Sequence, residues 1–262
     1  MSTSVLLSME EGLATLTLSR PERKNALNRQ VFEQLGDALN QLRSNPQVKA
    51  LLLTGAGSDF CSGGDINNMG GEVEASARQA TMTDANRVLV SLMEFDRPVI
   101  AAVDGVAFGA GFSLALAADF VIASERARFC MAFARIGAVA DMGASYTLPR
   151  IVGYQKAKEI IYCARELSAQ DALALGIVLE THPPEAFLDR AREIARSMGN
   201  MSPTAFGMSK RLLGRTFEST LQAQLDAEAS AQTLAMTSAY FHAATARFLH
   251  KEPPMYEWPT TP

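Results

Sequence analysis

Residues 48–66 read VKALLLTGAGSDFCSGGDI, an apolar run that passes directly into a glycine-rich loop. The continuous apolar segment 48–54 is typical of a strand that is buried on both faces, as the strands of parallel sheets are. Paired glycines in the loop 60–66 let the main chain adopt unusual angles and approach a ligand closely. Because open α/β sheets bind ligands beyond the carboxyl ends of their strands, the stretch predicts an α/β fold and makes the loop a candidate site. Taken alone, the loop is explained more simply as a tight turn in which Asp65 caps a short helix.

Strand and helix patterns alternate along the rest of the first 200 residues. Segments 5–9 and 13–18 alternate apolar and polar residues and predict a β-hairpin, and the apolar spacing over 28–43 predicts a helix capped by Asn28. We expect further helices over 83–93, 110–118, 148–163 and 169–175, and further strands over 98–103, 120–123 and 177–180. This order favours α/β layering with parallel strands.

Beyond residue 200 the strand pattern ends. Segments 203–213 and 217–250 are rich in alanine and predict helices, so we divide the chain into an α/β core over 1–200 and a helical region over 201–262. The apolar residues of the second segment either face another subunit or pack on the chain's own core, and the pattern does not choose between these alternatives. They are Leu221, Leu225, Ala229, Leu234, Tyr240, Phe241 and Phe248.

The composition excludes several classes of protein. The chain has 262 residues, 24 of them basic and 28 acidic, so its net charge of −4 gives no overall field that attracts nucleic acid or an anionic membrane. No apolar run is long enough to span a bilayer. Three scattered cysteines and an N-terminus without a signal-peptide pattern predict a cytoplasmic protein in a reducing compartment. Three histidines without CxxC or HExxH spacing give no metal site.

A second glycine-rich loop, GVAFGAGFS over 105–113, follows a predicted strand and opens a predicted helix. Unpaired N–H groups at the start of a helix suit an anion or a developing oxyanion. A dinucleotide fingerprint is a weak alternative, because Leu114 stands where the third glycine belongs. A serine hydrolase elbow around Ser113 is equally weak, because Ala115 replaces its last glycine.

Asp141 is the third candidate, as the only carboxylate between Glu125 and Glu159. Its small, apolar surroundings would desolvate the carboxyl group and raise its pKa toward that of a general base. From its position alone, an N-cap of the following helix explains Asp141 equally well. With two loops offering N–H groups, one carboxylate could carry out a 1,3-proton shift, whereas hydration of a double bond asks for a second group that activates water.

Several motifs in one order resemble the crotonase superfamily of enoyl-CoA hydratases and isomerases. They are PERKNALN (21–28), LLLTGAG (51–57), FCSGGDI (60–66), RPVIAAVDG (97–105), LPRIVG (148–153) and FLHK (248–251). The resemblance implies a spiral of ββα units followed by a C-terminal helical trimerisation region. It also implies an acyl-CoA thioester as substrate, a homotrimer or a dimer of trimers as the assembly, and no cofactor, since coenzyme A is part of the substrate.

The resemblance assigns roles to particular residues. It implies that the peptide N–H groups of Gly64 and Ala110 form an oxyanion hole for the thioester. The residues it implies for binding coenzyme A are Arg23, Lys24, Ser62, Asp65 and Ile66, together with Phe248 and Lys251, often from a neighbouring subunit. We also expect the stretch 69–87 to border the acyl pocket.

The chain departs from the hydratases of this family at two positions. Those hydratases carry two glutamates where this chain has Ser113 and Phe133. Asp141 instead coincides with the catalytic aspartate of the dienoyl-CoA isomerases and of the ring-1,2-epoxyphenylacetyl-CoA isomerases of phenylacetate breakdown, and CMAFARIG (130–137) looks most like the latter. The resemblance therefore implies an acyl-CoA isomerase with Asp141 as its single acid/base. The alternatives are a hydratase that uses Asp141 and a bound water, and a catalytically silent acyl-CoA-binding or RNA-associated scaffold.

Overall fold

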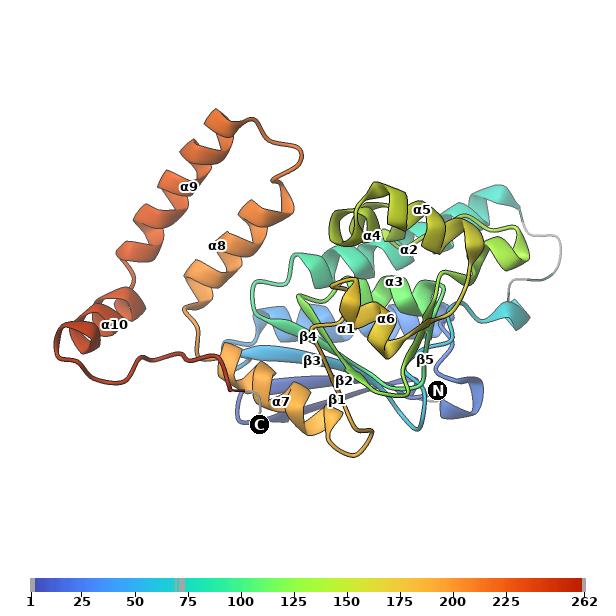
Figure 1. Ribbon diagram of the computed structural model, residues 1–262, viewed down its shortest axis with the longest axis horizontal. Coiled ribbons are helices and arrows are strands. Elements are labelled where there is room, and N and C mark those ends of the chain that lie inside the picture. Colours follow the sequence, from blue (N-terminus) through green and yellow to red (C-terminus); the bar gives the residue numbers. More distant parts are fainter. Residues whose placement is uncertain (1–2, 69, 71–73, 261–262) are drawn as a thin grey trace.

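The structure, a computed structural model, describes residues 3–68, 70 and 74–260 of the chain. Figure 1 shows an α/β body and, extending from one side of it, an arm of three helices over residues 203–249. The body is built on a six-stranded sheet with the strand order β1-β2-β3-β4-β6-β9. These strands are β1 (Val5–Glu10), β2 (Leu13–Leu18), β3 (Ala50–Gly55), β4 (Val99–Val103), β6 (Phe120–Ser124) and β9 (Glu180–His182).

Strand directions follow the sequence patterns. β1 and β2 form the predicted antiparallel hairpin, and every later neighbour in this sheet is parallel, as the continuous apolar runs indicate. A smaller sheet holds β5 (Val106–Phe108), β7 (Arg128–Cys130) and β8 (Leu167–Ser168). The strand expected over 177–180 is wrong in its bounds, because the N–H groups of Ile177 and Val178 still donate to the carbonyl of Ala172 at the end of a helix. Pairing with β6 begins only at Leu179, whose N–H donates to Val121.

The chain winds as the predicted spiral of ββα units. After β3, Cys61 forms an isolated parallel bridge with Ala107 beside the small sheet, and α2 (Ala75–Met93) follows. The next unit is β4, β5 and α3 (Ala110–Leu116), and the one after it is β6, β7, α4 (Ala144–Val152) and α5 (Tyr154–Cys163). Each turn thus places one segment in each sheet before a helix closes it, which confirms the α/β fold class.

Most predicted helices are present, with differences at their ends. Asn28 caps α1 as predicted, since its side chain accepts the N–H of Val31 at 2.9 Å. The helix expected over 148–163 is two helices separated by Gly153, and the one expected over 217–250 is also two, because Ser238 caps a new helix. The remaining helices are η1 (Pro21–Arg23), α1 (Arg29–Ser44), η2 (Ile66–Asn68), η3 (Ala132–Ile136), α6 (Ala169–Ala174), α7 (Phe187–Met198), α8 (Pro203–Gly214), α9 (Leu221–Met236) and α10 (Ala239–Leu249).

The six-stranded sheet is covered on both faces, which explains its apolar strands. Leu51 and Leu53 of β3 point into the main core with α1, α2 and α3. Ala50 and Leu52 point to the other face, where α7 packs with residues such as Ile194. Burying a leucine side chain contributes about 2 kcal/mol, so the alternating faces of one strand stabilise two layers at once.

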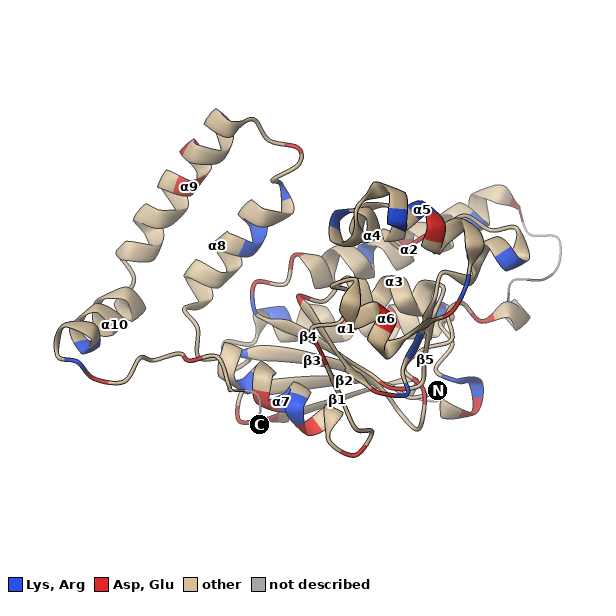
Figure 2. Cartoon of the chain, viewed as in Figure 1, with Lys and Arg blue, Asp and Glu red and all other residues tan. Residues whose placement is uncertain are grey.

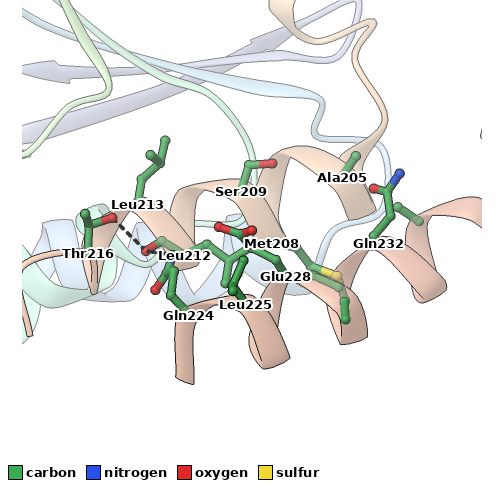
Figure 3. A pocket seen from close by; sticks show the side chains of 13 residues that line it. Ala205, Met208, Ser209, Leu212, Leu213, Thr216, Gln224, Leu225, Glu228 and Gln232 are labelled. Atoms are coloured by element: carbon green, nitrogen blue, oxygen red, sulfur yellow. Dashed lines mark hydrogen bonds between the residues drawn. The ribbon is translucent and has the colours of Figure 1, made fainter. Parts of the chain in front are cut away.

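The arm has little core of its own. In α9 and α10, both fully within the described part of the chain, no residue is buried, and Leu221 is 76 % exposed. Figure 2 shows few charged residues on these two helices. An open groove of about 750 Å³ lies between α8 and α9, where Figure 3 shows Met208, Leu212 and Leu225 among its lining residues. The apolar residues of α9 therefore do not pack on the chain's own core.

The last residues return from the arm to the body, so the region 201–262 is not helical throughout. The ring of Trp258 packs edge-on against Phe120 at a centroid distance of 5.7 Å. The buried guanidinium of Arg190 donates to the carbonyls of Pro259 and Thr260 at 3.0 and 3.1 Å. Within the described residues, no helix combines the length and the apolar character that crossing a membrane requires.

Asn25 joins two loops of the body and provides a test of the fold. It is buried with a φ of 55°, its side-chain amide donates to the carbonyls of Ala56 and Asp59, and its Oδ1 accepts the N–H of Arg20. Asn25→Ala leaves these buried groups without partners and is expected to lower the free energy of unfolding by roughly 2–4 kcal/mol in urea denaturation. Asn40→Ala, on the exposed face of α1, is the matched control and should be neutral; equal losses in both variants would contradict the role of Asn25.

Candidate active site

Two loops from successive turns of the spiral meet at main-chain contacts. The N–H of Cys61 donates to the carbonyl of Val106 at 2.8 Å, and the N–H of Phe108 donates to the carbonyl of Cys61 at 2.9 Å. Glycine is required where α3 starts, because a Cβ on Gly111 would lie 2.4 Å from the Cys61 carbonyl oxygen. The loop 60–66 is therefore hydrogen-bonded to the edge of the small sheet rather than being only a tight turn.

The contact brings the glycine pair 63–64 close to the start of α3. A Cβ on Gly63 would lie 2.8 Å from the Phe108 carbonyl oxygen and 3.5 Å from the nitrogen of Ala110, so the loops are in close contact there. Ala110 is the first residue of α3, whose N–H has no partner within the helix. Among the described residues, no acceptor takes the N–H of Gly64 or of Ala110. Two such donors can bind a carbonyl oxygen that gains negative charge.

The cysteine between these loops is not a nucleophile. Cys61 is fully buried, and burial raises the pKa of its thiol to about 12. The Sγ atom accepts the N–H of Gly63 at 3.4 Å. A thiol that stays protonated at neutral pH lacks the reactive thiolate form, so the residue serves packing.

Asp141 lies in a turn just before α4. Its Oδ1 atom is buried and accepts no hydrogen bond from the described residues. Burial raises the pKa of the carboxyl group, and the hydrogen bond from its own main-chain N–H opposes this shift. The N-cap alternative is wrong, because Gly143 occupies the cap and Asp141 offers only its main-chain carbonyl, to Ala144 at 3.1 Å. The carboxyl group is therefore half-buried, with its Oδ1 atom shielded from bulk solvent.

The turn of Asp141 lies directly against α3. The hydroxyl of Ser113 donates to the main-chain carbonyl of Asp141 at 3.0 Å. The ring of Phe133 covers the residue before α3, since a Cβ on Gly109 would be 3.8 Å from it. The structure therefore brings the helix that begins at Ala110 and the carboxylate-bearing turn together, next to an apolar ring.

Asp65 is held differently from Asp141. Its side chain is 6 % exposed and accepts a hydrogen bond from Arg20 at 2.9 Å, and this bond lowers the pKa of the carboxyl group. Its Oδ1 also accepts the N–H of Asn67 at the start of η2. The side chain thus fixes the loop from inside, and the main-chain N–H is also used within the chain, since it donates to the carbonyl of Leu27 at 2.8 Å.

The other residues expected to bind coenzyme A fall into two groups. Arg23 and Lys24 are exposed next to Ser62, whose N–H donates to the carbonyl of Lys24 at 2.9 Å, and Ile66 follows with 67 % of its surface exposed. Phe248 and Lys251 lie at the end of α10, on the far side of the molecule from β5 in Figure 1. One chain therefore brings the first group to the loops but not the second.

Some supporting residues were missed from the sequence. Asn25 carries a weak signal, as an asparagine in a loop, but its three part-buried hydrogen bonds could not be foreseen. Leu89 of α2 packs against Gly143, where an added Cβ would lie 2.6 Å from the Cδ2 atom of Leu89. The sequence gives no indication of this contact, because Leu89 is one of many apolar residues in a helix. Of the stretch 69–87 expected to border the acyl pocket, 75–87 belong to α2, and residues 69 and 71–73 lie outside the described residues.

The spiral of ββα units with two facing glycine loops defines a crotonase-type protein. A family model described as enoyl-CoA hydratase/isomerase matches residues 8–259, and the chain belongs to this family. The crystal structure of an enoyl-CoA hydratase/isomerase from Cupriavidus metallidurans CH34 superposes with a TM-score of 0.93 and 36 % identity, over 99 % of this chain and 98 % of that one.

Curated relatives carry the names of two reactions. The 1,2-epoxyphenylacetyl-CoA isomerase of Escherichia coli K12 is 36 % identical over 255 residues, which cover 96 % of this chain and 97 % of the relative. The 2,3-dehydroadipyl-CoA hydratase of the same organism is 32 % identical over 254 residues, which cover 97 % and 98 %. The chain is thus a hydratase/isomerase family enzyme, and similarity alone does not separate the two reactions.

The buried carboxyl group of Asp141 gives a prediction for stability against pH. Because its folded-state pKa is raised, the stability that it contributes is present at acid pH and is lost as the pH rises through that pKa. Asp141→Asn is therefore expected to be more stable than the wild type in thermal unfolding at neutral pH, with the gain vanishing below the ordinary carboxyl pKa. Asp65→Asn, which loses a paired charge of lowered pKa, should show the opposite sign at neutral pH; destabilisation of both variants would contradict the assignment.

Proposed function

We propose that this enzyme is an acyl-CoA isomerase in which Asp141 is the single acid/base and the N–H groups of Gly64 and Ala110 hold the enolate oxygen. The observation that carries this proposal is the buried, unpartnered Oδ1 of Asp141 in a turn packed on the helix that Ala110 begins. A desolvated carboxylate is a stronger base than one in water, and paired N–H donors suit the anion formed when it takes a proton.

The proposed reaction starts with the thioester carbonyl between the two N–H donors. Asp141 takes a proton from the α-carbon, the C–H electron pair moves toward the carbonyl, and an enolate forms. The carboxyl group of Asp141 then gives a proton to the γ-carbon as the double bond moves into conjugation. Each N–H donor is worth roughly 3–4 kcal/mol in such a transition state. Atoms and electrons balance without water or an oxidant, so coenzyme A enters only as part of the substrate.

The surroundings of Asp141 favour isomerisation over hydration. Ser113 is fully buried with its hydroxyl donated to main-chain carbonyls, and Phe133 presents a ring. Neither residue supplies the second acid/base group that water addition needs. The carboxylate of Asp65 is already held by Arg20. The name of the isomerase relative from Escherichia coli supports rearrangement of an epoxide ring as a further candidate for this chain.

We also propose a binding mode for coenzyme A. The exposed cations of Arg23 and Lys24 lie beside Ser62, and Ile66 offers an apolar surface on the same side of the loops. The phosphates of coenzyme A need cations, and its adenosine needs an apolar surface. Phe248 and Lys251 would complete the binding site from another subunit, since the arm holds them away from the loops of their own chain.

The proposed assembly is a homotrimer or a dimer of trimers in which the arm of one chain contacts the next. Leu213, Phe217 and Leu221 are each more than 70 % exposed. Met208, Leu212 and Leu225 line the groove between α8 and α9 together with polar side chains (Figure 3). Exposed apolar patches of this kind mark interfaces. The chain alone leaves this surface in water, which favours a second copy as its cover.

Asp141→Asn tests the reaction. The amide keeps the shape of the side chain but cannot accept the substrate proton, so kcat for migration of a double bond in 3-enoyl-CoA thioesters should fall about 10²–10⁴-fold. Formation of the conjugated thioester is followed by its ultraviolet absorbance, and entry of solvent deuterium at the α-position by mass spectrometry. Ring-epoxide thioesters are tested in the same way, with ring expansion as the readout.

Asp189→Asn is the matched control, because this carboxylate is exposed on α7. It should keep the wild-type rate. Full activity in Asp141→Asn would overturn the assigned base. Gain of one water by a 2-enoyl-CoA thioester would favour the hydratase alternative, and absence of both double-bond migration and deuterium exchange in the wild type would favour a silent acyl-CoA-binding scaffold.

Leu225→Glu tests the assembly. Leu225 is half-exposed in the groove between α8 and α9, so a charge there should oppose burial against another chain. Light scattering is expected to give a multiple of the 28.2 kDa chain for the wild type and a single chain for the variant. Gln41→Glu adds the same charge on the exposed face of α1 and should leave the mass unchanged. A single-chain mass for the wild type would contradict the proposal.

A further inference from the structure

We propose that Ser113 is a positioning residue, whose hydroxyl holds the main chain of Asp141 and thereby sets the distance between the base and the N–H of Ala110. The assignment rests on the proposed function, because it concerns how that base is held. Ser113 is fully buried in α3, and its Oγ lies 3.0 Å from the carbonyl oxygen of Asp141, 28 residues away in sequence.

The hydroxyl has two carbonyls within reach and one proton to donate. The other carbonyl is that of Gly109 at 3.3 Å, which is the ordinary bond of a helical serine to the preceding turn. The bond to Asp141 is shorter and joins two separate elements of the spiral. A serine needed only for its own helix would gain nothing from that second contact.

The turn after Asp141 needs to be held from outside. Met142 has a φ of 47° and Gly143 a φ of 72°, so two residues in succession lie in the left-handed region. For a non-glycine residue such as Met142 this conformation costs about 1–2 kcal/mol. Three contacts oppose that cost: the buried side chain of Met142, the N–H of Ala144 and the hydroxyl of Ser113, the last two on the same carbonyl oxygen of Asp141.

The carboxylate depends on this main-chain support. Its Oδ1 has no hydrogen-bond partner in the described part of the chain, so no side chain orients the base directly. The shift of its pKa arises from burial and from its own main-chain N–H, and no charged group among the described residues contributes to it. The main chain at Asp141 therefore determines where the carboxyl group lies.

Ser113 also links the base to the oxyanion donors. It lies one helical turn beyond Ala110 on the short helix α3. One rigid turn of helix and one hydrogen bond thus separate the N–H of Ala110 from the main chain of Asp141. Displacing a base by about 1 Å can lower the reaction rate on the order of 10²-fold, so loss of this single hydroxyl should lower the rate of the reaction.

Ser113→Ala is the first test. The variant is expected to lower kcat of the isomerase reaction about 10- to 100-fold with little change in KM, because the thioester and coenzyme A contacts stay in place. The released turn lets water reach the carboxyl group, so the acid limb of the pH–rate profile should move to lower pH. Thr54→Val removes another buried hydroxyl, which donates to the carbonyl of Ala102 at 3.0 Å, and should leave kcat and the pH profile unchanged.

A second pair of variants covers the case in which Ser113→Ala does not fold. Ser113→Thr and Ser113→Val add the same methyl group to the same buried site and differ only in the hydroxyl. The threonine variant is expected to keep more than tenfold higher kcat than the valine variant, together with the wild-type acid limb. Equal kcat and equal pH profiles in the pair would overturn the positioning role.

The outcomes separate this inference from the proposed function. Loss of activity in Asp141→Asn with wild-type kcat and pH profile in Ser113→Ala overturns the role of Ser113 and leaves the isomerase intact. Parallel losses in Ser113→Ala and Thr54→Val make the hydroxyl merely structural and overturn the role as well. Full activity in Asp141→Asn overturns the proposed function itself.

Discussion

The close approach of two glycine loops is the constraint on which the rest of the site depends. Cys61 is bonded to β5 through both its N–H and its carbonyl, and Gly111 fits against that carbonyl only because it has no side chain. This contact fixes the offset between successive turns of the spiral. The N–H groups of Gly64 and Ala110 have no internal partner in the described residues, whereas the N–H of Asp65 donates to the carbonyl of Leu27 and that of Gly109 to the carbonyl of Cys130.

Two aspartates near these loops, Asp65 and Asp141, differ in their partners and in the direction of their pKa shifts. Asp65 is paired with Arg20, which lowers its pKa and lets it hold the loop as a permanent anion. Asp141 has no such partner, and burial raises its pKa. An unpaired buried carboxylate weakens the fold at neutral pH, so its presence at a turn that the rest of the structure holds in place points to chemistry rather than to stability.

The arm connects to the site through α4, the helix that follows the Asp141 turn. The hydroxyl of Tyr146 donates to the carbonyl of Gly214 at 3.0 Å, and the guanidinium of Arg150 lies 3.4 Å from the centre of the Tyr146 ring. At its base, α8 is tied to the body by the ion pair of Lys210 with Asp119 at 2.9 Å. The helical arm is thus fixed to the body through α4 and α8, in addition to the contacts of the returning residues 258–260, and the contact with α4 lies next to the turn that carries the carboxylate.

Local patterns in the sequence are enough to predict the layered α/β class, the hairpin, the capped helix α1 and the two glycine loops, because apolar periodicity and turn chemistry are local properties. The sequence also singled out Asp141, an isolated carboxylate in an apolar stretch. Three features are visible only in the folded chain: the buried Oδ1 of Asp141 has no partner among the described residues, Asp65 is paired with Arg20, and Ser113 reaches Asp141. The tertiary structure also placed the helix breaks at Gly153 and Ser238. Contacts between residues far apart in the chain depend on how successive turns of the spiral stack, and no local pattern records that.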